Sequence, residues 1–376
     1  MSALYGIGDL LSPTNLIEAY QRLASIHTTN PLFDFYNAKA ATQADGDTFE
    51  FVVFDDTRNA APINFRGSPA RTLDTQGADK KTVSPIHVFN EITIPSASVE
   101  FLREANSPSI QDRGMAELRR QMELFAKRHA VTRAVTLAHT FRGAVYFDSN
   151  GLPLESSSGA ATTVDLGVGA THKTQLAHAS NGGSDIIATA WDNPIASILT
   201  DLRQIRDAAE YDRCPIPKHV WMNTVAIPWI VNNDEIADFV RLGSNPAEVG
   251  KQLEMYAGMT NMLVIGDWTF HFTNASYVGA DGSTVRPVVP LTTAIITPDV
   301  NDGDWFLHLE SSETIPTDDG VIGSLDEYFS KTRKVFGDFA YARIADNPLK
   351  VTMRMGMNFG YFFKEPNAVY YPTVDF

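Results

Sequence analysis

The sequence predicts an α+β fold built around two unusually long elements. Residues 107–142 hold a helical pattern, and at about 1.5 Å per residue such a helix is a rod of roughly 50 Å. Residues 349–363 alternate between apolar odd positions and, up to residue 360, even positions that are polar or glycine, which predicts one long half-buried strand. Such a strand needs an equally long partner over its apolar face, so we expect helix 107–142 to pack along it. Residues 190–334 alternate between helix and strand patterns, so we expect them to form a separate α+β unit inserted between the long helix and the long strand.

Composition excludes several classes of protein. The chain has 45 acidic and 30 basic residues, a net charge of −15, which argues against a simple basic nucleic-acid binder. Its single cysteine excludes a disulfide framework and fits a reducing cytosolic origin. No apolar stretch is long enough to cross a bilayer, and no secretory signal follows Met1. The charge is uneven, because residues 1–150 carry 15 basic and 17 acidic residues, net −2, and the rest carries net −13.

The first 95 residues predict an arm followed by an extended loop. The arm, residues 1–45, carries aromatic residues that must be buried either on their own domain or on a neighbour, namely Phe33, Phe35 and Tyr36. Residues 48–54 and 86–94 have strand patterns. About thirty residues rich in Asp, Arg, Gly, Pro and Thr separate them, too many for an ordinary loop. We expect an extended hairpin over 46–95 that reaches away from the body and carries Arg66, Arg71, Lys80 and Lys81.

Capping residues define the ends of the long helix. Ser107 is a good N-cap, Pro108 suits the first helical position, and Gly143 predicts the stop. One face is apolar at spacings of three and four, through Met115, Leu118, Met122, Phe125 and His129. The other faces are basic and include Arg119, Arg120 and Arg128. Pairing within the helix and solvation explain these arginines more simply than a contact with nucleic acid.

The middle of the chain predicts shorter elements. Residues 151–189 hold strand patterns between Gly- and Ser-rich turns. Beyond them we expect a helix from Asn193, a buried strand over 219–225 and helices near 232–240 and 249–257. Residues 270–278 and 285–297 predict one hairpin around the Asp281–Gly282 turn.

Familiar catalytic and metal-binding motifs fail in this chain. The run from Gly167 to His172 is a partial dinucleotide-binding motif in which histidine replaces the third glycine, and no apolar helix follows. The acidic run 299–304 has Gly303 where a calcium ligand is required, which favours a turn. The nine histidines form no zinc motif, and Cys214 is expected to be a small buried residue. We therefore expect no catalytic residue, no metal and no cofactor.

Several segments resemble the shell proteins of tailed phages. They are residues 61–71, residues 83–94, the Trp191–Ala196 run with the helix after it, and the stretch from Asn347 to the aromatic C-terminus. With the arm, the hairpin and the long helix and strand, they are similar to the Hong Kong 97-type capsid fold and, more specifically, to the lambda-like major capsid protein E family. The resemblance implies an N-terminal arm (1–45), an extended loop (46–95), a peripheral domain (96–150 and 335–376) with a spine helix (107–142) and a long strand (349–363), a connector (151–189) and an axial domain (190–334).

The resemblance also implies a function and partners. It implies a major capsid protein that self-assembles into hexamers and pentamers of an icosahedral head shell, around the double-stranded DNA of a tailed bacteriophage, in the cytoplasm of a bacterial host. A separate scaffold or protease-scaffold protein is expected because no long helical segment precedes the arm, together with a portal, room for a decoration protein and no membrane partner. Intersubunit contacts are expected at Phe33, Phe35, Tyr36, Arg66, Arg71, Lys80 and Lys81, and weak inner-face contacts with the packaged DNA at Arg119, Arg120 and Arg128. The alternatives are an encapsulin-like or other virion shell protein, which needs a cargo-binding inner surface, and an unrecognised hydrolase, which needs a cleft with perturbed carboxylates.

Overall fold

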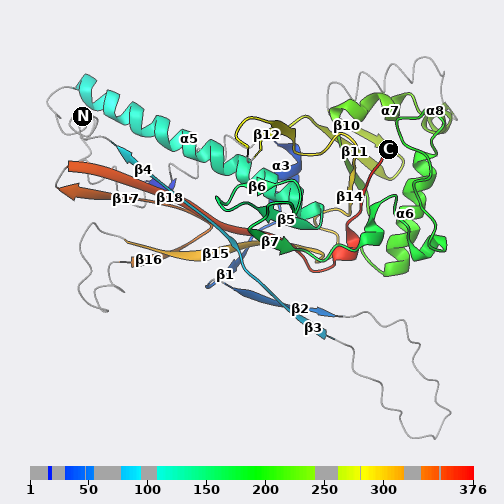
Figure 1. Cartoon of the computed structure of the whole chain (residues 1–376), viewed down its shortest axis with the longest axis horizontal. Helices are drawn as coiled ribbons and strands as arrows, with labels where there is room; N and C mark the ends of the chain where they lie inside the picture. Colours follow the sequence, from blue (N-terminus) through cyan, green and yellow to red (C-terminus); the bar gives the residue numbers. More distant parts are fainter. Residues whose placement is uncertain are drawn as a thin grey trace, which may run out of the picture.

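The computed structural model describes residues 16–18, 30–46, 48–54, 78–94, 108–241, 261–279, 281–316, 332–346 and 349–376. In these ranges a large sheet lies beside one long helix, and a smaller α+β unit lies at one end of the molecule (Figure 1). None of the helices described is long and apolar enough to span a membrane. The predicted helix near 249–257 lies outside the described residues.

The large sheet is organised around β18 (Leu349–Phe363), the long strand that the alternation predicts. Three strands pair antiparallel with it, namely β4 (Ile86–Ile94), β15 (Phe306–Pro316) and β17 (Asp338–Asp346). β15 in turn pairs in parallel with β1 (Thr42–Ala44) and antiparallel with β16 (Thr332–Phe336). The sheet therefore takes in β4 from the segment predicted as extended loop and β15 from the segment predicted as axial domain, while β16 crosses the predicted boundary between the axial domain and the second part of the peripheral domain.

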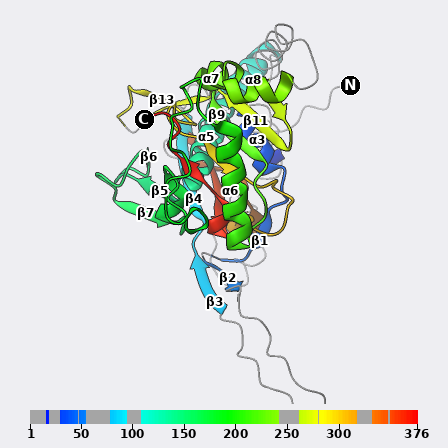
Figure 2. The same ribbon diagram turned by 90° about the vertical axis from the view of Figure 1, so that its right-hand side faces the viewer.

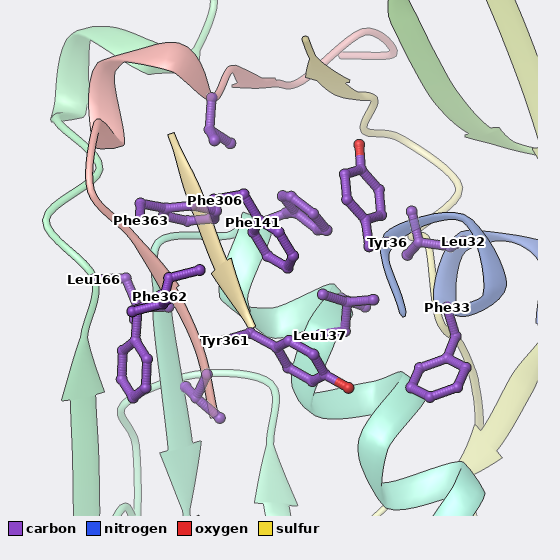
Figure 3. Packing of buried hydrophobic residues seen from close by; sticks show 14 of the residues in the cluster. Leu32, Phe33, Tyr36, Leu137, Phe141, Leu166, Phe306, Tyr361, Phe362 and Phe363 are labelled. Atoms are coloured by element: carbon purple, nitrogen blue, oxygen red, sulfur yellow. The ribbon is translucent and has the colours of Figure 1, made fainter. Parts of the chain in front are cut away.

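The long helix covers this sheet. α5 runs from Pro108 to Phe141, within one residue of the predicted range, and lies along the sheet (Figure 1). Its side chains pack on the odd positions of β18 in two clusters. In the cluster nearer the smaller α+β unit, Leu137 and Phe141 lie among the rings of Phe306, Tyr361 and Phe363 (Figure 3). The other cluster joins Met122, Phe125 and Ala126 to Met353 and Met355. The packing of the helix along the strand is thus confirmed.

The prediction that β18 is half-buried is wrong for its second part. From Met355 to Phe363 every residue is buried, on both faces of the sheet. Gly356 is covered by the ring of Phe339, and Gly360 by the ring of Phe362. The Asn358 side chain is hydrogen-bonded to His87 and, at 3.2 Å, to Glu313. Polar and glycine positions are thus compatible with burial here, because aromatic rings fill the space over the glycines and a polar partner satisfies the amide.

The smaller α+β unit, called the axial unit below because it lies within the range predicted as axial domain, is built on a four-stranded sheet with a second hydrophobic core. The strand order is β10 (Met262–Ile265), β11 (Trp268–Thr273), β9 (His219–Asn223) and β14 (Ile295–Thr297). Among the described residues, the helices of the unit are α6 (Ile198–Asp212), α7 (Ile227–Val231) and α8 (Asp234–Arg241). In this core, Leu202 and Ile205 of α6 pack against buried side chains of the sheet. These include Val220, Phe270 and Ile296.

The hairpin predicted from 270–278 and 285–297 is wrong except at its tip. β11 ends at Thr273, whose hydroxyl accepts a hydrogen bond from the Ala275 amide at 3.2 Å and so turns the chain out of the strand. Only β12 (Ser276–Val278) and β13 (Val285–Pro287) pair across the turn. β14 pairs with β9 instead.

The connector and the C-terminus link the two cores. β5 (Ala144–Phe147) pairs with β6 (Pro153–Leu154) and β7 (Thr162–Asp165), and the 3-10 turns η1 (Ala170–His172) and η2 (Ala179–Asn181) follow. Near the C-terminus, β19 (Tyr371–Pro372) pairs in parallel with β8 (Lys173–Thr174). Tyr370 and Val374 are fully buried in the second core, while Tyr371 packs against the first, so the last residues contact both cores.

Candidate assembly surfaces

The first candidate surface is the hairpin of β2 (Phe49–Phe54) and β3 (Ala78–Val83). The strands pair antiparallel and, among the described residues, form a two-stranded sheet of their own. In both views the hairpin points away from the rest of the subunit (Figures 1 and 2). On it, Lys80 forms an exposed ion pair with Glu50 (Nζ to Oε2, 2.5 Å), while Lys81 is half-buried. Arg66 and Arg71 lie outside the described residues.

The root of the hairpin is fixed to the body of the subunit. Phe51 is buried in the first hydrophobic core, and Val83 packs against that core. A cavity of about 250 Å³ lies beside them, lined by the hairpin residues Phe51 and Lys81 to Val83, by Asp165 to Gly167 and by Phe362 and Phe363. The hairpin is therefore anchored at one end and extends beyond the body at the other.

The aromatic residues of the arm do not form an outer surface. They lie on α3 (Pro31–Asn37), and Asn30 caps this helix by accepting a hydrogen bond from the Leu32 amide at 3.1 Å. Phe33 and Tyr36 are 2% and 0% exposed and lie in the first core (Figure 3). The structure thus corrects the expectation of intersubunit contacts for these two, because their apolar rings are buried on their own domain. Phe35 is half-buried and packs on His219, with 4.6 Å between ring centroids.

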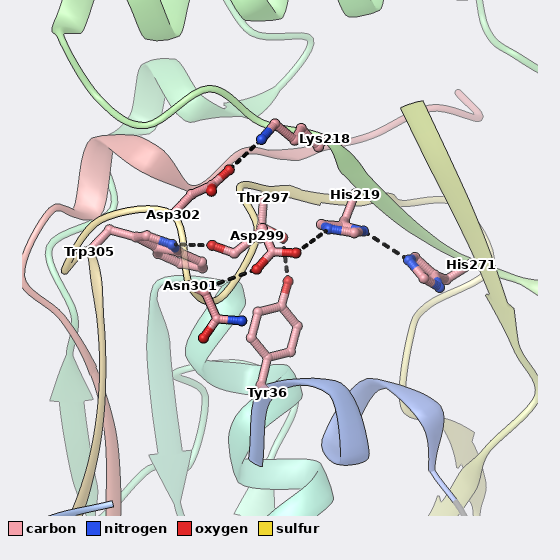
Figure 4. A network of polar contacts seen from close by, with 9 residues as sticks. All are labelled: Tyr36, Lys218, His219, His271, Thr297, Asp299, Asn301, Asp302 and Trp305. Carbon is pink, nitrogen blue, oxygen red and sulfur yellow. Dashed lines mark hydrogen bonds and ion pairs between the residues drawn. The ribbon is translucent and has the colours of Figure 1, made fainter. Parts of the chain in front are cut away.

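A polar network joins this arm helix to the axial sheet, and sequence reasoning missed it. The Tyr36 hydroxyl is hydrogen-bonded to the Thr297 hydroxyl at the end of β14. The Asp299 carboxylate lies 3.3 Å from Nε2 of His219, and Nδ1 of His219 lies 3.0 Å from Nε2 of His271 (Figure 4). These residues come from four distant segments, so only the folded chain brings them together.

Burial keeps this network uncharged at its centre. Burial lowers the pKa of His219 in spite of Asp299, and burial together with His219 lowers the pKa of His271 to about 4. Burial also raises the pKa of Tyr36 far above its ordinary value. Two neutral imidazoles and a neutral phenol suit a structural contact, because none of them changes its protonation near neutral pH.

The basic face of α5 is divided between internal ion pairs and exposed side chains. Arg133 pairs with Asp338 of β17, and Arg142 pairs with Glu155, which also accepts a hydrogen bond from Tyr277. Arg120 and Arg128 are exposed, and the side chain of Arg119 lies outside those described. Arg133 on the helix and Arg142 directly after it are thus used within the subunit, in contacts to other elements and not along the helix itself.

Two further features could carry chemistry, namely the single cysteine and one cluster of two histidines and an aspartate. Burial, with Glu365 and Asp212 nearby, raises the pKa of Cys214 to about 12, so the thiol stays protonated. The one described group with the geometry of a metal site is formed by His172, His178 and Asp212. Sequence reasoning missed this group because the carboxylate lies 34 residues after the second histidine, outside any common spacing motif.

Comparison with known proteins identifies the family. The model of the family described as phage major capsid protein E matches residues 20–309. Among solved structures, the chain is similar to the prophage capsid protein of Escherichia coli CFT073, with 10% identity, a TM-score of 0.54 and coverage of 97% of this chain and 99% of that chain. It is also similar to a phage-related protein of Bordetella bronchiseptica RB50, with 11% identity, a TM-score of 0.46 and 97% of each chain covered. No curated protein matches the chain.

The family match covers most of the chain, and the first of these structures shows the same fold over nearly all of it. The predicted α+β architecture of the Hong Kong 97 type is therefore confirmed. A capsid protein of this kind builds a virion shell from copies of itself. The chain belongs to the phage major capsid protein E family and is a head shell protein of a tailed phage.

Proposed function

We propose that this chain forms the hexamers and pentamers of an icosahedral head shell, and that the β2–β3 hairpin clamps each subunit to a neighbouring copy. The projecting hairpin carries the proposal. A two-stranded hairpin is marginally stable alone in water, and this one extends beyond the body that anchors its root. A neighbouring subunit would supply the surface that it lacks on its own.

Charge supports this arrangement. The segment between β2 and β3 contains Arg58, Arg66 and Arg71 together with Asp55, Asp56 and Asp74, and Lys80 is exposed on β3. The second part of the chain carries most of the net negative charge, and the axial unit exposes Asp192, Asp207 and Asp234. Ion pairs from the arginines of this segment to acidic side chains of a neighbouring axial unit would be head-to-tail contacts between copies, which close into rings.

The partners outside the shell are also proposals. On the basis of the family we infer a separate scaffold or protease-scaffold protein and a portal, with room for a decoration protein, and assembly in the bacterial host cytoplasm. Packaged DNA would meet the inner face only weakly, and exposed arginines of α5 such as Arg128 are candidates for those contacts. The role is structural, without turnover of a substrate.

Charge reversal in the loop tests the clamp. We expect the Arg66→Glu/Arg71→Glu variant to fold normally and to give at least tenfold fewer shells, because like charges would then face each other across the contact. The measurement is negative-stain electron microscopy with light scattering, after co-expression with the neighbouring phage genes. Arg66→Lys/Arg71→Lys is the matched control and should assemble. Normal shells from the glutamate variant would refute the clamp.

A further inference from the structure

One face of α5 is exposed over about three turns, on the side of the helix opposite to the large sheet. Positions three and four residues apart lie on the same face of a helix. Met122 and Phe125 lie on the buried face, in the cluster that packs on β18. The opposite face carries five exposed side chains, namely Arg120, Leu124, Lys127, Arg128 and Val131.

Two large apolar side chains lie at the centre of this exposed face. Leu124 and Val131 are 40% and 46% exposed, and a separation of seven residues places them one above the other along the helix. Together with Arg120 and Lys127 they follow spacings of four, three and four residues, which are the spacings of a coiled-coil seam. Arg128 borders this seam on one side. The face is therefore shaped to pack along a second helix, whose side chains would insert between its own.

The charges of the seam determine which helix can pack on it. Its basic and apolar residues alternate, so a parallel pair of two α5 helices would bring the basic positions together, and an antiparallel pair would place each of them against an apolar side chain. Both arrangements disfavour a second α5 as the partner. A helix with acidic residues opposite Arg120 and Lys127, and apolar residues opposite Leu124 and Val131, would complement the seam.

The existing ion pair on this face does not prevent such a contact. Nζ of Lys127 lies 3.1 Å from Oε1 of Glu123, one turn earlier on α5, and both side chains are partly exposed to solvent. An exposed pair of this kind contributes little to stability. Lys127 can therefore turn to a carboxylate of the partner at small cost.

The apolar side chains favour a protein partner over nucleic acid. Contacts with DNA phosphates use basic side chains and gain nothing from an exposed leucine or valine. Packing under a helix would instead remove Leu124 and Val131 from water, which is favourable by about 25 cal/mol per Å² of apolar surface. The weak contacts of Arg128 with packaged DNA, proposed above, leave these two apolar residues unexplained.

We propose that this face of α5, residues 120–131, binds an acidic amphipathic helix of a separate protein. The inference rests on the proposed function, which includes a scaffold or protease-scaffold protein, and it assigns to that partner both a binding surface and the kind of segment that occupies it. At about 1.5 Å per residue the seam is roughly 16 Å long. An interface of this length is small, which suits a partner that binds reversibly.

Peptide binding to the unassembled full-length subunit tests the surface. The probe is a fluorescently labelled helical peptide of three heptads, with leucine and glutamate alternating along its seam. The comparison probes are the same peptide with lysine in place of glutamate, and a DNA duplex of about 20 base pairs. We expect fluorescence anisotropy to show that the glutamate peptide binds about tenfold or more tightly than either comparison probe.

Two double variants separate the apolar contribution from the charged one. Leu124→Ser/Val131→Ser should weaken binding of the glutamate peptide by about tenfold. Val285→Ser is the matched control, because it changes a valine that is 66% exposed on β13 and should leave binding unchanged. Lys127→Glu/Arg128→Glu should reverse the preference, so that the lysine peptide binds more tightly than the glutamate peptide. Circular dichroism checks that each variant is folded.

Four outcomes would contradict the proposal. They are a wild-type subunit that does not bind the glutamate peptide, equal binding by Leu124→Ser/Val131→Ser, tighter binding of the duplex, which would assign the face to nucleic acid, and self-association of the subunit that the serine variant abolishes, which would assign it to a second copy. If a double variant does not fold, Leu124→Ser alone and the three probes on the wild type still decide the question.

Shell formation is measured separately, by electron microscopy of the wild type after co-expression with the neighbouring phage genes. Absence of shells there would count against the proposed function, whereas the peptide measurements use the unassembled subunit and test only the face of α5. The two failures are therefore distinguishable.

Discussion

At the scale of single residues, Gly356 shows how one position sets the packing of the large sheet. It lies in β18 opposite Phe339 of β17 and Phe89 of β4. A Cβ atom at this position would lie 2.2 Å from Cζ of Phe339 and 2.6 Å from the backbone oxygen of Val88. The carbonyl cannot move without breaking the pairing of β4 with β18. Glycine is therefore required here by close approach and not by its backbone angle.

We predict that Gly356→Ala lowers the free energy of unfolding by about 2 kcal/mol, because the added methyl group overpacks a closed site. Urea unfolding followed by circular dichroism measures the change. Thr352→Val is the control on the same strand, where the side chain is half-buried, and it should change stability by less than about 0.5 kcal/mol. Equal effects of the two substitutions would show that the site can relax.

At the scale of elements, the sequence predicts the helices and strands whose hydrophobic periodicity continues over many residues. α5 and β18 were predictable because their periodicity continues over 34 and 15 residues with few interruptions. The burial of both faces of β18 could not be predicted, because it depends on rings such as that of Phe339, which another strand contributes. The prediction of a hairpin over 270–297 failed for a local reason. The turn at Thr273 ends β11, so that one apolar run is divided between two sheets. The cluster of His172, His178 and Asp212 was missed for a global reason, since its members meet only in the fold.

The contact between α5 and β17 depends on one largely buried ion pair. Arg133 and Asp338 have side chains 12% and 13% exposed and are separated by 205 residues in the sequence. Burial raises the pKa of Asp338, and the attraction of Arg133 only partly opposes it. The pair thus lies where an unpaired charge is poorly solvated.

Substitution of one member of the Arg133–Asp338 pair should lower the free energy of unfolding more than substitution of both. We predict that Asp338→Asn lowers the free energy of unfolding by about 3 kcal/mol, and that Arg133→Met/Asp338→Leu loses less than half of that. Lys127→Ala is the control, because it breaks only the exposed pair with Glu123 and should cost no more than about 0.5 kcal/mol. A double-mutant cycle by urea unfolding measures the coupling. A double variant less stable than Asp338→Asn would contradict this account.

At the scale of the whole molecule, buried histidines in different parts of the subunit make stability depend on pH. Burial is the main cause that lowers the pKa of His129, His271 and His308, each to about 4. The unfolded chain binds protons at these rings from about pH 6.5, and the folded chain binds them only near pH 4. Their contribution to stability is therefore complete above about pH 6.5 and is lost as the pH falls toward 4.

Four carboxyl groups whose pKa is raised by burial oppose this trend, namely Asp201, Glu310, Asp338 and Glu365. Burial raises the pKa of Asp201 to about 7, and its Oδ2 accepts a hydrogen bond from Nε1 of Trp191 at 2.9 Å. Its unfolded pKa lies near 3.8, so its contribution is complete below that pH and is lost as the pH rises toward 7. Burial lowers the pKa of six histidines in all, against these four carboxyl groups, so we predict a net loss of several kcal/mol in the free energy of unfolding between pH 7 and pH 4. Urea titrations of the unassembled subunit at half-unit steps of pH measure it.

Asp201→Asn separates the two contributions, because the amide resembles the protonated carboxyl and can still accept the bond from Trp191. We predict that it raises the free energy of unfolding by about 2 kcal/mol at pH 8, leaves it nearly unchanged at pH 4, and so steepens the loss on acidification. Asp267→Asn, at an exposed carboxylate 80% accessible, is the matched control and should leave the slope unchanged. A subunit that becomes more stable on acidification, or an Asp201→Asn variant less stable at pH 8, would contradict the balance of buried groups. The trend of the whole subunit with pH thus depends on which titratable groups the two cores enclose.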